Sequence, residues 1–367
     1  MKTLVDIDVG RDRDMDTECV WDSILDVDAL EELLESLYIP KGNNVEQFLN
    51  DIYQGKQIFS IAYLKEITTG VIVSEWSDLK SVFVMILIIM IVASVLQNIG
   101  EIFAKNGIRE IAEYVMLVFL NTVLMKGYMQ SEMIVSDAAE ELMTFIKLLI
   151  PAYFVAIGST NGMVTVSGFY QFVLLVIGIL EQLVIAVIIP AVNVFVMVLF
   201  MDAILGGEHL KNISMLLEKA VLLGLKAAMS IVIGFGAIQS IITPVIGSVN
   251  RNLLEKTISV IPGVGDISES VTSVLTGSAV LIKNTIGVFG MIILVMICGV
   301  PICKVGLIGG SIKLAGALGS VLGKSRLVQC TNRIGDGCFL MAKVMFTIGA
   351  LFFIMIAMIA FSTNRGI

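Results

Sequence analysis

Histidine is nearly absent from this chain, and charged residues are scarce. The 367 residues include one histidine, His209, and 15% Asp, Glu, Lys and Arg, where soluble domains carry about 25% charged residues. A His-based metal site, or a Ser-His or Cys-His catalytic pair, would depend on that single histidine. Because this composition lacks the residues that most catalytic and metal sites use, we expect no enzyme activity, no metal and no cofactor.

Closely spaced cysteines and clustered basic residues are also lacking. The five cysteines stand at positions 19, 298, 303, 330 and 338, without a CxxC pair, so we expect no disulfides. Nucleic-acid binding needs a clustered basic face, and the chain has a formal net charge of -8. We therefore expect no direct binding of DNA or RNA.

What the chain has instead is an acidic start followed by a long apolar body. Residues 1–78 carry 17 acidic and 6 basic residues, and residues 79–367 carry 15 acidic and 18 basic residues. The mean hydropathy of the chain is +0.93. This division predicts an acidic N-terminal segment over residues 1–78 and a multi-span transmembrane domain over residues 79–367.

The acidic segment contains the pattern of two short amphipathic helices. Apolar residues recur at steps of three and four over residues 23–37 and again over residues 44–52. The first stripe includes Leu30, Leu34 and Leu37. Either these stripes dock onto a partner protein, or they pack on each other and on the membrane body. Residues 1–20 have no uninterrupted apolar core, so no signal peptide is predicted.

The body consists of apolar runs, each long enough or nearly long enough to cross a bilayer, which takes ~20 helical residues. The prediction is an all-α, polytopic membrane protein with seven to nine transmembrane helices. Nine runs are candidates: Leu79–Leu96, Ile111–Met125, Leu142–Ile157, Phe169–Ile189, Ala191–Leu205, Leu222–Ile246, Ser278–Val300, Ile302–Leu322 and Phe339–Phe361. Lys105 and Arg109 follow the first run and only Lys80 precedes it, so the positive-inside rule places residues 1–78 outside the cytoplasm.

Four prolines lie within or at the ends of these runs: Pro151, Pro190, Pro244 and Pro301. Proline removes a helix hydrogen bond, and broken helices at membrane depth occur where the backbone is packed in protein or lines a wet cavity. The prolines therefore mark either functional helix breaks, as in transporters and channels, or ordinary helix ends.

Polar residues within the apolar runs are candidate intramembrane or assembly positions. Glu181 interrupts the run Phe169–Ile189, where an unpaired carboxylate is expensive, and Lys283 is the nearest counter-ion by type. The other candidates are Asn193 and Asn284, and Asp202 also lies near a run. Glu181 either lines a polar contact or reaches the membrane interface.

Residues 248–277 are less apolar and are predicted as a polar helix–turn–helix loop around the turn at 261–266. Gly263 and Gly265 form a bare GxG without a preceding strand, so a turn is a better interpretation than a dinucleotide loop. Farther on, the spacing of Gly306 and Gly310 predicts a face for close helix packing or oligomerisation.

Several stretches of the chain form a distinctive set of motifs. Residues 261–304 contain IPGVGD and then a Leu-Ile-Lys-Asn-x-Ile-Gly run and an Ile-Cys-x-x-Pro run. Further stretches are ASVLQN at 93–98, ELMTFIKLLIP at 141–151 and LVQCTNRIG at 327–335. Together they resemble the stage III sporulation protein AE family of endospore-forming bacteria, and residues 261–304 are the most specific part. Members of that family usually begin with a cleavable signal peptide, and this sequence departs from that pattern.

The resemblance implies a component of a channel or secretion-like complex that links mother cell and forespore across the two engulfment membranes. It also implies partners from the same stage III operon, namely its ATPase and its ring-forming membrane proteins, and a place in the mother-cell membrane around the forespore. No catalytic or ligand residues come with it. The alternative is an autonomous secondary transporter, favoured by Glu181 and the interrupted helices, although no convincing repeat relates the two halves.

Overall fold

The computed structural model describes residues 25–35, 45–55, 80–95, 106–161, 163–205, 209–258, 265–322 and 326–364. Throughout these ranges the regular structure is helical, which confirms the all-α prediction. Some residues singled out above lie outside the described ranges, namely Cys19, Leu37, Lys105 and residues 261–264, and so do the side chains of Leu34, Arg109 and residues 238–279.

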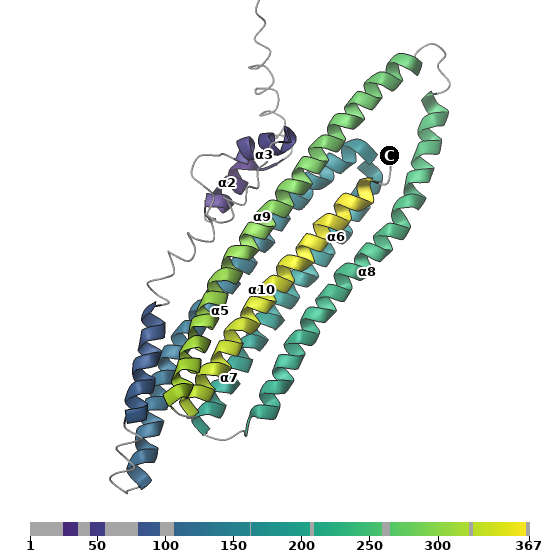
Figure 1. Ribbon diagram of the computed structural model, residues 1–367. Coiled ribbons are helices and arrows are strands. Elements are labelled where there is room, and N and C mark those ends of the chain that lie inside the picture. Colours follow the sequence, from purple (N-terminus) through teal and green to yellow (C-terminus); the bar gives the residue numbers. More distant parts are fainter. Residues whose placement is uncertain are drawn as a thin grey trace, which may run out of the picture.

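Five long helical rods form an elongated bundle (Figure 1). They are α5 (Asn106–Asn161), the continuous stretch of α6 (Met163–Leu183), the π-helix η1 (Val184–Ile188) and α7 (Ile189–Leu205), then α8 (Lys211–Ile258), α9 (Gly265–Leu322) and α10 (Arg326–Asn364). Consecutive rods run in opposite directions (Figure 1). With 58 residues, α9 is ~87 Å long, nearly three times the ~30 Å thickness of a bilayer core.

The predicted number of seven to nine membrane spans is not confirmed. Among the described residues, three helical segments are long and apolar enough to cross a membrane, namely Tyr170–Leu205, Val280–Val321 and Arg326–Ala360, and Lys80–Val95 is a shorter apolar helix. Two pairs of predicted spans merge into single segments, namely 169–189 with 191–205, and 278–300 with 302–322 in α9. The predicted spans 111–125 and 142–157 both lie in α5, which is not among the three segments, and the span 222–246 lies partly outside the described side chains.

The four prolines lie inside helical segments of the structure and do not end them. Pro151 is within α5 and Pro301 within α9, and Pro244 falls in the range of α8. At Pro190 the helix widens just before the ring: residues 184–188 are π-helical, and the Ile189 N–H bonds to the Val184 carbonyl. A wider turn relieves the clash between a proline ring and the carbonyl four residues earlier.

The most extensive helix contact is between α9 and α10, and it includes small residues at the points of close approach. A Cβ on Gly309 would lie 3.1 Å from the Cβ of Cys338, and one on Gly335 would lie 2.6 Å from the Cγ of Lys313. By contrast, no atom lies within 4 Å of the Cβ position at Gly306 or Gly310. The packing face within the chain is therefore displaced from the predicted Gly306–Gly310 pair.

The two N-terminal helices pack on the bundle. Helix α2 (Val27–Glu35) contacts α5 and α3, and α3 (Val45–Tyr53) contacts α9. Asp26 caps α2, because its Oδ1 accepts the Ala29 N–H at 3.2 Å. Leu30 is completely buried, and the Phe48 ring meets Phe289 edge-on with 5.9 Å between centroids. Part of the leucine stripe is thus covered by the chain itself.

Candidate functional site

The predicted polar positions do not converge on one site. Glu181, on α6, pairs with Lys147 of α5, whose Nζ lies 2.7 Å from Glu181 Oε1. Lys283, which sequence reasoning suggested as the counter-ion, is buried on α9, and the neighbouring Asn284 is exposed. Sequence spacing could not identify Lys147, because α5 and α6 are antiparallel and bring together residues 34 positions apart.

Asn193 belongs to a separate hydrogen-bond chain between α7 and α5. The Tyr128 hydroxyl donates to Asn193 Oδ1 at 2.6 Å, and Asn193 Nδ2 donates to Glu132 Oε1 at 3.2 Å. Each polar group in this chain therefore has a partner on the facing helix, as buried polar groups require. The arrangement holds α7 in register with α5.

A third polar contact joins α7 to α10. Asp202 is 2% exposed, its Oδ2 pairs with Nη1 of Arg333, and its Oδ1 accepts the Leu210 N–H at 2.9 Å. A single buried carboxylate thus fixes both the α7–α10 contact and the turn that leads into α8. Sequence reasoning noted Asp202, a charged residue in an apolar stretch, but missed Arg333, which lies among the polar residues of 329–336 and does not stand out there.

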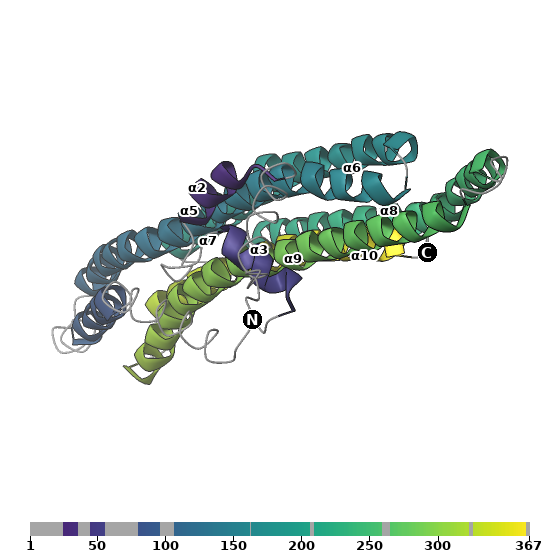
Figure 2. The same ribbon diagram turned by 90° about the horizontal axis from the view of Figure 1, so that it is seen from above.

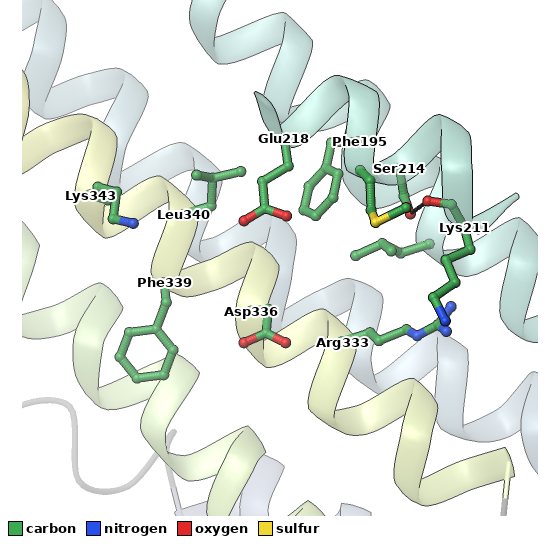
Figure 3. A pocket seen from close by; sticks show the side chains of 11 residues that line it. Phe195, Lys211, Ser214, Glu218, Arg333, Asp336, Phe339, Leu340 and Lys343 are labelled. Carbon is green, nitrogen blue, oxygen red and sulfur yellow. Dashed lines mark hydrogen bonds between the residues drawn. The ribbon is translucent and has the colours of Figure 1, made fainter. Parts of the chain in front are cut away.

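Arg333 of this last contact also borders a polar cavity of about 450 Å³ between α7, α8 and α10. Its charged lining residues are Lys211, Glu218, Arg333, Asp336 and Lys343. The basic ends of Lys211 and Arg333 lie near one another, and the carboxylates of Glu218 and Asp336 face the middle (Figure 3). Such a lining suits a small polar ligand that carries both charges.

The far edge of the cavity is supported from α9. Lys313 Nζ lies 2.5 Å from Asp336 Oδ1 and 5.3 Å from the centre of the Phe339 ring. The ammonium group of Lys313 thus partly offsets the charge of Asp336 at this edge, although both side chains are exposed and the pair contributes little to stability. In the part of the chain that the structure describes, no group of three or more His, Cys, Asp or Glu side chains could hold a metal ion.

Comparison with known proteins gives one consistent result. A sequence model of the family described as stage III sporulation protein AE matches residues 43–363. A stage III sporulation protein AE from Bacillus subtilis (strain 168) is 20% identical over 310 residues, which are 84% of this chain and 75% of that relative. No solved structure matches the chain.

Proposed function

The chain belongs to the stage III sporulation protein AE family and so has a role in sporulation, and from this premise we propose that it is an integral membrane component of a channel or secretion-like complex. The observation that carries the proposal is the family match over 43–363. The proposal assigns the chain no enzyme activity. Its work is to provide membrane helices and contact surfaces for the assembly.

The architecture supports a structural role within such a complex. Polar contacts tie α5 to α6, α5 to α7 and α7 to α10, so the rods are held in a fixed register. Several rods also extend well beyond the thickness of one bilayer, which leaves helical surface for partners. The partners we propose are the ATPase and the ring-forming membrane proteins of the same stage III operon.

An autonomous secondary transporter remains the alternative. It was favoured mainly by Glu181 as an unpaired carboxylate in an apolar run and by helices interrupted at proline. The carboxylate has a protein partner in Lys147, and the helices continue through the prolines. Neither observation now favours a transporter.

For its location we propose a multi-pass protein of the mother-cell membrane around the forespore, with residues 1–78 outside the cytoplasm. Three long apolar segments support membrane association. For the orientation, Lys105 and Arg109 follow the first apolar run, and by the positive-inside rule these residues lie on the cytoplasmic side.

Affinity purification of the tagged full chain from sporulating cells tests the proposal. The expected result is co-purification of the operon's ATPase and ring-forming proteins, and their absence from a purification of an unrelated tagged multi-span protein. A chain that purifies alone and moves a solute across liposome membranes would contradict the proposal and support the transporter.

A further inference from the structure

One side of α5 carries charge at the depth where the neighbouring helix is apolar. The exposed stripe of α5 contains Asp137, Glu140, Thr144 and Lys147 at steps of three and four residues. These steps place the four side chains on one face of the helix. Over this stretch the surface of α5 is therefore polar.

The depth of this stripe follows from contacts between α5 and α9. Gly290 of α9 lies against Leu149 of α5, and Gly127 of α5 lies against Ile308 and Ile312 of α9. Because the two helices are antiparallel, residues 137–147 lie beside the part of α9 between those contacts. That part overlaps residues 284–303, a run of 20 residues without Asp, Glu, Lys or Arg, which is the length needed to cross a bilayer core.

A second observation at the same depth comes from α6. Glu181 lies within the apolar segment Tyr170–Leu205 and pairs with Lys147, yet the two side chains are 31% and 52% exposed. In contrast, apart from Asn284 at one end, the large exposed residues of α9 and α10 in their charge-free stretches are apolar, such as Val288, Val295 and Phe353. Figure 2 shows α5 and α6 along one side of the bundle and α8, α9 and α10 along the other.

Hydrocarbon can cover the apolar side but not the charged one. Charged side chains at membrane depth face a protein interior or a water-filled cavity, because exposing them to lipid costs several kcal/mol. We propose that the α5 stripe, together with Glu181, faces a water-filled lumen that this chain encloses with other subunits of its complex. This inference rests on the proposed function, and it adds which face of the chain lines the lumen of the complex.

The charges of this face also predict which solutes it favours. Asp137, Glu140 and Glu181 outnumber Lys147, so the face is net negative. A charged lining of this kind attracts cations and repels anions in channels. The lumen therefore favours cations in its vicinity.

Cysteine accessibility in membranes opened from sporulating cells tests the inference. The parent chain has serine in place of Cys19 and the exposed Cys303, and keeps the three buried cysteines. Thr144→Cys is the test variant and Val295→Cys is its matched control, since both positions are exposed and uncharged. We expect a water-soluble thiol reagent to modify Thr144→Cys but not Val295→Cys, and a lipid-soluble reagent to modify Val295→Cys.

The charge of the reagent gives a second measurement. The modification rate of each reagent is first divided by its rate with a free small thiol, which corrects for intrinsic reactivity. The corrected rate at Thr144→Cys should be roughly threefold higher for a cationic reagent than for an anionic one. Adding Glu140→Gln should lower that ratio. An equal or inverted ratio overturns the negative character of the lumen.

Other outcomes separate this inference from the proposed function. If Thr144→Cys reacts only with the lipid-soluble reagent, or with neither reagent, the stripe faces lipid or a dry interface. This outcome overturns the proposed lumen even where the operon partners co-purify. If Thr144→Cys reacts with the water-soluble reagent in a chain that purifies without those partners, the water-facing stripe stands and the proposed complex fails.

Discussion

Two ion pairs join helices in different regions of the bundle, and their burial is opposite. At the end where α7 meets α10, the side chain of Asp202 is 2% exposed beside Arg333, which is 29% exposed. Where α5 meets α6, the Lys147 and Glu181 side chains are 52% and 31% exposed. The same kind of contact therefore stands in two different surroundings.

The difference in burial decides how much each ion pair contributes to the stability of the bundle. A buried charge that loses its partner keeps its desolvation cost, so breaking a buried pair is strongly destabilising. An exposed pair in water contributes little, because solvent screens it and two long side chains must be ordered. The Asp202–Arg333 pair should therefore stabilise the bundle. The Lys147–Glu181 pair should contribute little to stability, and it makes the exposed face of α5 and α6 polar.

The largest expected effect is that of Asp202→Ala. Removing this carboxylate leaves Arg333 without its partner and the Leu210 N–H without its acceptor. We expect a loss of about 3 kcal/mol of stability, measured as thermal or denaturant unfolding of the detergent-solubilised chain. Asp202→Asn keeps a hydrogen-bond acceptor but not the charge, so its stability should lie between that of the wild type and that of Asp202→Ala. A loss below 1 kcal/mol for Asp202→Ala would show that burial does not distinguish the pairs.

A smaller effect is expected for Leu30→Glu, because the contact between α2 and the bundle is apolar and contains no ion pair at this residue. Leu30→Glu places a carboxylate at the completely buried contact of α2 with the bundle. Burying a leucine side chain contributes ~2 kcal/mol, so α2 should detach and become a protease target while the long rods stay inserted. The exposed Glu32 on the same helix supplies the control, Glu32→Leu. Equal protease resistance of wild type and Leu30→Glu would contradict the packing of α2 on α5.

The helical class and the amphipathic N-terminal helices could be predicted from sequence because both depend on local periodicity. The predicted range 44–52 corresponds to α3 at Val45–Tyr53, and 23–37 to the shorter α2 at Val27–Glu35. Rod length could not be predicted, since proline and short polar stretches are also typical of helix ends. Pro301 is instead buried inside α9, and the exposed charges Asp137, Glu140 and Lys147 lie within α5 without ending it.

The polar contacts were predictable by residue type but not by partner. Glu181 and Asn193 stand out because they are polar residues in apolar runs. Their partners, Lys147 and Tyr128, lie on α5 and are set by the register of antiparallel helices. That register is set by packing between segments far apart in the sequence, which no local pattern encodes.

The smallest expected effect is that of Glu181→Gln, and it sharpens the comparison most. If Lys147 and Glu181 face water, removing the carboxylate should change the free energy of unfolding by less than ~1 kcal/mol, and Lys147→Gln should have a similar effect. A double-mutant cycle with both changes measures the pair directly, and raising the salt concentration should weaken its coupling further. A coupling of several kcal/mol that does not respond to salt would mean that the pair is desolvated in the membrane. The exposed pair would then resemble Asp202–Arg333, and the water-facing side of α5 would lose one of its two supports.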